Sequence, residues 1–300
     1  MSPLRLAVFT GLSMLAFTGN ALICRAALLG GSIDAASFTA LRLLSGALML
    51  WLIVWLRGLQ RRAAAPSPRA SCLSGLVLFA YAAAFSYAYA RVPAGAGALI
   101  LFAAVQTVMI GYGFYRGERF IPLQWLGLLL AYGGLLALML PRAGAASASS
   151  PTPFAYAMML LSGGAWGVYS LLGRRGGDPR LVSAHNFLYA LPFALLLSLV
   201  MLWLEAPQWG REGVLYALLS GAGASALGYI VWYSALPALK ATTAASVQLS
   251  VPLMTALGGI VLLSEPFTLH FLLVSLAIVG GLALVIFSKS RRVAKSGLRP

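Results

Sequence analysis

The 300-residue chain has little charge for its length, and very little negative charge. Charged residues make up 9% of it, and only six are acidic against 21 lysines and arginines. A soluble domain of this size needs a charged surface, which this composition does not supply. Apolar residues make up 61% of the chain, and the mean hydropathy is +0.90. The sequence therefore predicts a membrane protein.

Several kinds of site are missing from the sequence. It has no P-loop, no His-Glu-x-x-His and no cluster of cysteine and histidine, so we expect no cofactor, no metal and no catalytic nucleophile. The only cysteines, Cys24 and Cys72, have no metal-ligand spacing, and the topology below puts them near opposite membrane faces, which argues against a disulfide. The net charge of +15 does not indicate nucleic-acid binding, because the basic residues lie in short breaks between apolar runs.

Ten apolar runs occur along the chain, each of roughly 18–25 residues and so long enough to cross a bilayer as a helix. Their approximate bounds are 4–24, 36–56, 71–90, 95–115, 121–141, 153–173, 182–204, 213–236, 241–263 and 267–288. The sequence thus predicts an all-α polytopic fold with ten transmembrane helices. Arg5 ahead of the first run would also suit a signal peptide, but the run is too long for the apolar part of one.

The basic residues predict how the chain is oriented. With the N-terminus inside, 16 lysines and arginines fall in cytoplasmic segments and one, Arg42, falls within a span. The outer segments hold four: Arg25, Arg91, Arg142 and Arg211. This bias predicts that both termini are cytoplasmic, which also requires an even number of spans.

The second half of the sequence repeats features of the first. Residues 118–137 align with residues 265–284 at a constant offset of 147. Within this alignment Glu118 matches Glu265, and Gly133-Gly134 matches Gly280-Gly281. Upstream of it, Tyr89–Pro93 resembles Tyr233–Pro237 at an offset of 144, and Ser13-x-x-Ala16-Phe17 resembles Ser162-x-x-Ala165-Trp166. The predicted repeats are residues 1–146 and 147–300. Because each holds five spans, an odd number, the second must be inverted in the membrane, as in many secondary transporters.

These motifs, in this order, resemble those of the drug/metabolite transporter (DMT) superfamily, EamA type. The matching features are Arg42 in the second span, a tyrosine-rich third span ending at Pro93, Gly117-Glu118 after the fourth span, and the two Gly-Gly pairs. Ser264-Glu265 departs from the Gly-Glu pattern. Within the family the chain is most similar to YddG-type exporters of aromatic amino acids. The resemblance implies export of amino acids or related metabolites across the bacterial inner membrane by alternating access.

Polar groups inside the spans are candidates for substrate binding, because they are costly in lipid unless they are satisfied. The carboxamides of Asn20, Gln106 and Gln248 are such groups, although they would serve equally as contacts between helices. Because Pro252 has no backbone N–H, the backbone carbonyl of Gln248 lacks its helical donor. Polar residues also precede Gln248 in the same span. These neighbours are Thr242, Thr243 and Ser246.

Deep aromatic residues are the second group of candidates, and together they would suit an apolar or aromatic amino acid. They are Tyr81, Phe85, Trp166, Tyr169 and Tyr229, and for each of them ordinary packing is an equal alternative. Arg42 would reach headgroups or carbonyl groups, with capture of a substrate carboxylate as the alternative.

No carboxylate lies near the middle of a span, which favours facilitated export over proton coupling. His185 is the reservation, since imidazole can relay protons, but helix packing would also explain it. The sequence leaves two other functions open: a flippase for lipid-linked substrates or an exporter of drugs or other metabolites with the same fold, and, more remotely, an intramembrane enzyme. Substrate identity and oligomeric state are not determined by the sequence.

Overall fold

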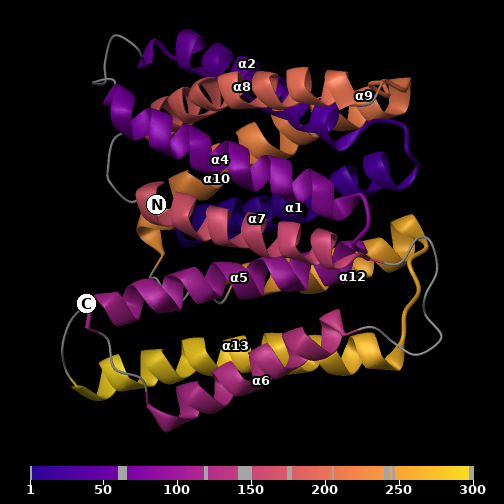
Figure 1. The fold of residues 1–300 in the computed structure, drawn as a ribbon. Coiled ribbons are helices and arrows are strands. Elements are labelled where there is room, and N and C mark those ends of the chain that lie inside the picture. Colours follow the sequence, from indigo (N-terminus) through magenta and orange to yellow (C-terminus); the bar gives the residue numbers. More distant parts are fainter. Residues whose placement is uncertain are drawn as a thin grey trace.

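The computed structural model describes residues 2–59, 66–117, 121–140, 151–173, 178–204, 206–239, 244 and 247–296, with residues 289–296 described by backbone alone. The described residues form helices and connecting segments (Figure 1). The helices are α1 (Pro3–Leu29), α2 (Ala35–Leu56), α4 (Pro68–Tyr89), α5 (Ala94–Tyr115), α6 (Pro122–Met139), α7 (Pro153–Leu172), α8 (Pro179–Leu204), α9 (Arg211–Leu218), η2 (Leu219–Leu227), α10 (Gly228–Ala235), η3 (Leu236–Ala238), α12 (Ser250–Leu263) and α13 (Leu269–Ser296).

The described helices confirm the predicted all-α class. Nine of them, counting Arg211–Ala238 as one, are long and apolar enough to cross a membrane. Of the expected span 241–263, the described residues form a continuous helix over Ser250–Leu263, and residues 241–243 and 245–246 lie outside the described part of the chain. Glu118, Thr242, Thr243 and Ser246 lie outside the described residues.

Three of the helices begin with the same local signal. α1, α4 and α7 each have a proline at the first position and a hydroxyl residue before it: Ser2, Ser67 and Thr152. In each case the hydroxyl oxygen accepts a hydrogen bond from the backbone N–H three residues later, at 3.2–3.4 Å. The hydroxyl oxygen satisfies one of the backbone N–H groups of the first turn that have no partner within the helix. Proline has no backbone N–H, and at the first helical position that N–H would have no partner, so these helix starts are encoded by the local sequence.

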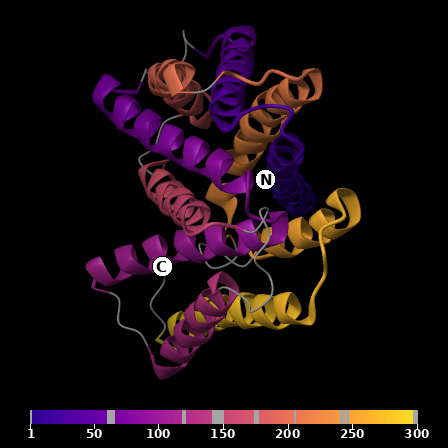
Figure 2. The same ribbon diagram turned by 45° about the vertical axis from the view of Figure 1, so that its right-hand side comes forward.

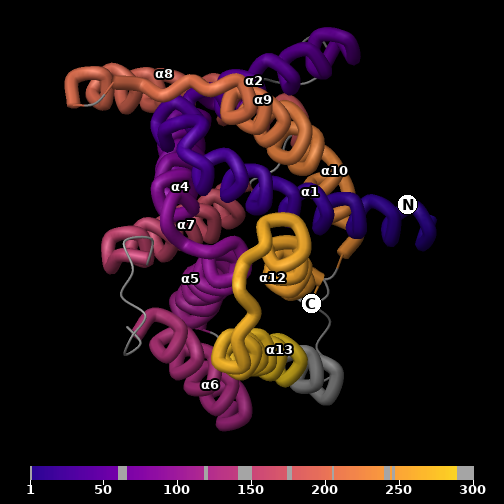
Figure 3. Tube along the Cα trace, turned by 90° about the vertical axis from the view of Figure 1, so that its right-hand side faces the viewer, coloured from indigo at the N-terminus to yellow at the C-terminus, as the bar shows by residue number. Residues whose placement is uncertain are grey.

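Helices of the two halves alternate in space. α2 packs against α8 at one end of the molecule, and α6 packs against α13 at the other (Figure 1, Figure 2). Between these pairs, α4 contacts α7 and α8, α5 contacts α7 and α12, and α1 contacts α10, η2 and α12. Figure 3 shows α1 running across the middle of this arrangement, between α10 and α12. The core is therefore built almost wholly from contacts between the halves.

The glycine pairs have unequal roles in this packing. A Cβ at Gly281 would lie 2.5 Å from the carbonyl oxygen of Gly127, and a Cβ at Gly127 would lie 2.6 Å from that of Gly281. Gly280, next along α13, has no atom within 4 Å of such a Cβ. One glycine of the pair therefore allows α6 and α13 to approach closely, as small residues do in membrane helices.

Ser264 ends α12 in the left-handed conformation, with φ of 53°. Gly117 has the equivalent place after α5, with φ of 84°. A non-glycine residue in this region costs about 1 kcal/mol or more. We expect Ser264→Gly to raise the free energy of unfolding by about 0.5–1 kcal/mol, and Gly117→Ser to lower it by a similar amount. Thermal unfolding of the purified protein measures both, and a lower Tm for Ser264→Gly would contradict the prediction.

Candidate functional site

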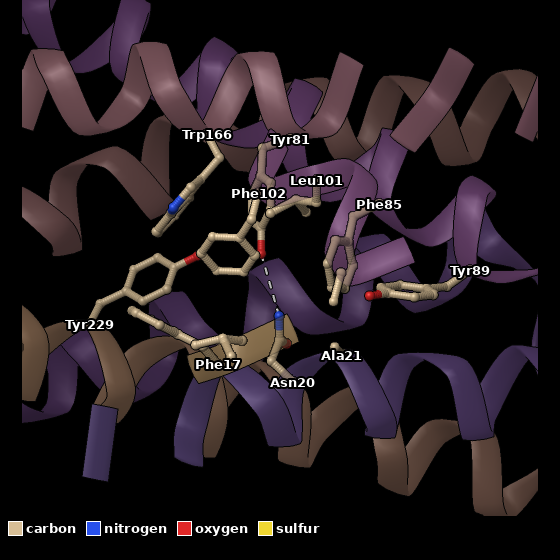
Figure 4. A pocket seen from close by; sticks show the side chains of 12 residues that line it. Phe17, Asn20, Ala21, Tyr81, Phe85, Tyr89, Leu101, Phe102, Trp166 and Tyr229 are labelled. Atoms are coloured by element: carbon tan, nitrogen blue, oxygen red, sulfur yellow. Dashed lines mark hydrogen bonds between the residues drawn. The ribbon is translucent and has the colours of Figure 1, made fainter. Parts of the chain in front are cut away.

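A pocket lies between the two halves, at the centre of the helix packing (Figure 4). Residues of α1, α4, α5, α7, α10 and α12 line it: Phe17, Asn20, Ala21, Tyr81, Phe85, Tyr89, Ala98, Leu101, Phe102, Trp166, Tyr229 and Val251. Its free volume is about 30 Å³. That is room for only one or two water molecules, so the pocket is closed around its aromatic side chains in this conformation.

The structure brings five of the eight predicted site residues to this pocket. They are Asn20, Tyr81, Phe85, Trp166 and Tyr229. Tyr169 lies behind the pocket wall, where its ring stacks on Trp166 with centroids 5.6 Å apart. The hydroxyl of Tyr169 accepts a hydrogen bond from Asn186 Nδ2 at 3.2 Å, so its polar group is already satisfied.

Gln106 and Gln248 are not among the residues that line this pocket. Gln106 is buried in α5, and Gln248 is half-buried just before α12. The sequence interpretation paired them because their spans are equivalent in the two repeats. Equivalent positions share a depth in the membrane but need not share a direction around the helix axis, and only the packing sets that direction.

The aromatic residues of the pocket form one connected cluster centred on Trp166. Its ring lies 4.9 Å from Tyr81, 5.1 Å from Tyr229 and 6.1 Å from Phe17, measured between centroids. Phe85 extends the cluster, 5.4 Å from Tyr81. Rings at these separations and tilts attract one another beyond their buried area. The cluster can therefore hold an apolar or aromatic group between its faces once the helices move apart.

Phe17 and Tyr89 line the pocket, although sequence reasoning did not select them. Both carried a usable signal. Phe17 is the repeat equivalent of Trp166, and Tyr89 continues the four-residue stripe of Tyr81 and Phe85 along α4.

Asn20 is held by hydrogen bonds on both sides of its carboxamide. Ser220 Oγ donates to Asn20 Oδ1 at 2.7 Å, and Asn20 Nδ2 donates to the Tyr81 hydroxyl at 3.4 Å. Ser220 belongs to η2, a π-helical segment inside the otherwise α-helical run 211–238. π-helical segments recur at functional sites because they redirect side chains locally. Here the segment carries one contact to α1 and another, described next, to α2.

Arg42 does not reach the headgroups, which corrects the favoured sequence interpretation. Its side chain is 1% exposed. Nε donates to Ser225 Oγ of η2 at 3.1 Å, and one terminal nitrogen donates to the Tyr81 hydroxyl at 3.1 Å. The guanidinium also lies over the rings of Tyr81 and Phe85, 5.2 and 5.1 Å from their centroids. Aromatic faces and hydroxyl oxygens therefore surround the charge at depth, which a span position alone does not reveal.

One ion pair within the described residues lies at the edge of the pocket. Arg25 Nε is 3.1 Å from Glu265 Oε1, and both side chains are largely buried, at 8% and 11% exposure. Arg25 also donates to the backbone carbonyl of Tyr89 at 2.8 Å. Both Glu265 oxygens accept from the backbone N–H of Ala94, the first residue of α5, at 3.0 and 2.9 Å. The carboxylate thus caps α5 and links α1, α4 and the α12–α13 connection.

His185 and the two cysteines are not among the residues that line the pocket. The imidazole packs on Trp51 with centroids 5.3 Å apart, and its Nδ1 is 2.9 Å from the carbonyl oxygen of Leu181, so it serves helix packing. Cys24 is buried, Cys72 is exposed, and both are free thiols. Within the described residues no group of three or more His, Cys, Asp or Glu side chains could hold a metal ion.

Similarity to solved structures extends over almost the whole chain. One, described as a crystal structure of a protein, superposes with a TM-score of 0.67 at 20% sequence identity, covering 97% of this chain and 99% of that one. At this identity the likeness establishes the fold alone.

Relatives in sequence and a family match carry the comparison further. A Pseudomonas aeruginosa protein, uncharacterized protein PA1977, is 53% identical over 297 residues, which are 99% of this chain and 100% of that protein. The uncharacterized transporter YoaV of Bacillus subtilis is 23% identical over 85% of this chain and 88% of its own. An uncharacterized transporter of Archaeoglobus fulgidus is 27% identical over 76% of this chain and 79% of its own. The EamA-like transporter family matches residues 5–140 and again residues 153–287, and the chain belongs to this family.

Proposed function

We propose that this transporter exports apolar or aromatic amino acids, or closely related metabolites, across the bacterial inner membrane. The observation that carries the proposal is the aromatic pocket between the halves, with Trp166 at its centre and Asn20 at its edge. Carriers place their substrate sites at the interface of their repeats, near the middle of the bilayer. An aromatic wall with few polar groups suits a small, largely apolar solute.

Alternating access is the proposed mechanism, with residues 1–146 and 147–300 as inverted repeats and both termini cytoplasmic. Two observations support it. The family matches each half separately, and contacts of the first half recur with the halves exchanged: α4 packs against α7 as α1 packs against α10, and α5 packs against α7 as α1 packs against α12. Two similar halves make inward-open and outward-open forms of comparable energy, which is what exchange between them requires.

Facilitated transport is the proposed energetics. Within the described part of the chain, no carboxylate lines the pocket, and Glu265 beside it is bound to Arg25 and to the start of α5. A proton-coupled carrier needs a titratable group that changes its charge with substrate binding. The site therefore offers export down the substrate's own gradient.

Proteoliposomes loaded with labelled phenylalanine or tryptophan test the proposal. We expect release faster than from protein-free liposomes. Trp166→Ala removes the centre of the aromatic cluster and is expected to lower the initial rate about tenfold or more, since buried aromatic contacts of this kind contribute a few kcal/mol. Trp203→Ala is the matched control, because Trp203 is 91% exposed and does not line the pocket.

Wild-type release no faster than from protein-free liposomes would exclude these amino acids as substrates. Equal loss in the two tryptophan variants would remove the pocket from the transport path.

A further inference from the structure

Arg42 is a buried cation with no carboxylate partner in the described structure. The ion pair of that structure joins Arg25 to Glu265, and Arg42 has hydroxyl groups and aromatic faces around it instead. Removing a charge from water costs several kcal/mol unless an opposite charge or full hydrogen bonding compensates for it. Arg42 has neither, so its surroundings in this closed conformation are incomplete.

Several hydrogen-bond donors around Arg42 and the pocket have no acceptor within the described residues. Among the described residues, the second terminal nitrogen of Arg42 has no hydrogen-bond partner, and neither does the hydroxyl of Tyr229, although both atoms are buried. The indole N–H of Trp166, which lines the pocket and can only donate, makes no hydrogen bond within the described residues. Buried polar groups in native proteins are normally paired, so an unpaired set points to a missing partner that accepts.

Tyr81 connects this positive charge to the pocket. Its hydroxyl oxygen accepts hydrogen bonds from both Asn20 and Arg42, at 3.4 and 3.1 Å. The hydroxyl proton is therefore directed away from these two donors and is free to bind an acceptor. Figure 4 shows the Tyr81 hydroxyl beside Asn20 within the pocket lining. When a hydroxyl oxygen accepts a hydrogen bond from a guanidinium, the hydrogen bond that the hydroxyl donates to an anion becomes stronger.

We infer that the group recognised in the substrate is a carboxylate, bound through the hydroxyl of Tyr81 with Arg42 supplying the compensating charge. Tyr229 and Trp166 are further donors in the pocket lining. The inference rests on the proposed function for the location of the site, and it narrows the substrate to acids. An ammonium group is not required, because the described lining offers it no carboxylate and Arg42 repels it. Aromatic acids without an amino group should therefore be ligands too.

The test compares 3-phenylpropionate with its neutral amide, 3-phenylpropionamide, and with the cation 2-phenylethylamine, using the full chain in lipid nanodiscs at pH 7. A ligand that binds the folded state raises Tm according to its concentration and Kd. We expect the acid to raise Tm saturably, and the amide and the amine to need at least about tenfold higher concentrations for the same shift, as loss of a charge-assisted hydrogen bond implies.

Variants locate the effect. Tyr81→Phe and Arg42→Gln are each expected to abolish the preference for the acid over the amide, and Arg42→Lys to keep part of it, because the charge remains. Tyr132→Phe is the matched control for Tyr81, since the hydroxyl of Tyr132 binds Thr107 outside the pocket lining. Tyr81→Phe, which changes one atom, keeps the test decisive even if Arg42→Gln does not fold.

Equal shifts with acid and amide in the wild type, a stronger shift with the amine, no shift with the acid, or an unchanged preference in Tyr81→Phe would each overturn the inference. The outcome is separable from that of the proposed function. A wild-type preference for the acid together with no release of phenylalanine from proteoliposomes would leave the carboxylate site standing and reject amino-acid export.

Discussion

Gly221→Ala is expected to cause a large loss of folded protein, whereas Gly223→Ala, two residues further along η2, is expected to have little effect. A Cβ on Gly221 would overlap the backbone carbonyl oxygen of Arg42 and the Oγ of Ser45. A Cβ on Gly223 meets no atom within 4 Å. The serine side chain can rotate away, but the carbonyl of α2 cannot move without shifting the helix, because cores are close-packed.

The expected cost of Gly221→Ala is about 3 kcal/mol, at the upper end of the range for overpacked sites, which corresponds to a fall in Tm of roughly 5 °C for a chain of this length. Gly223→Ala should stay within about 0.5 kcal/mol of the wild type or be slightly more stable, since alanine favours helices. Thermal unfolding and size-exclusion profiles of the two purified variants measure this difference.

Transport should fall in parallel with stability in Gly221→Ala, because separating η2 from α2 moves Ser225 away from Arg42. Equal Tm values for the two alanine variants would show that η2 and α2 do not approach each other as closely as the structure has them.

Glu265→Gln is expected to open the end of the pocket where α1, α4 and α5 meet. In the proposed orientation this is the outer end. The substitution removes the ion pair with Arg25, leaves that cation largely buried, and weakens the cap on α5 at Ala94. Breaking a buried pair on one side is strongly destabilising for the conformation that contains it, by about 3–5 kcal/mol. Partial exposure of the pair reduces this figure, but even about 1.4 kcal/mol changes the ratio of open to closed molecules tenfold.

The native thiol of Cys24 reports the opening, because it is adjacent to Arg25 and fully buried in the closed conformation. In a Cys72→Ser background, reaction of Cys24 with a membrane-impermeant maleimide should be about tenfold faster in Glu265→Gln than with Glu265 present. Glu212→Gln is the control, since Glu212 is an exposed acid without an ion pair in the described structure. Unchanged labelling of Cys24 in a folded Glu265→Gln protein would show that the pair does not hold this end closed.

Much of the candidate site was predictable as a set of residue types, but not as a set of contacts. Tyr81, Phe85, Trp166 and Tyr229 were selected because deep aromatic side chains would suit an apolar or aromatic amino acid, and they do line one pocket. Gln248 was selected because a polar side chain inside a span is costly unless it is satisfied, and it does not line the pocket. The spans are apolar on nearly all sides, so no amphipathic pattern indicates which face of each helix turns inward.

The sequence by itself determined the membrane class, the helical fold, nearly all the helix bounds and the resemblance to the family. These properties are local: run length is set by the thickness of the bilayer, and helix starts by proline and hydroxyl residues next to one another. Only the tertiary structure decided that Arg42 lies against Tyr81 and Ser225, and that Arg25 pairs with Glu265 across 240 residues of chain. Such contacts depend on how the helices are rotated and packed against one another, which composition and periodicity do not encode.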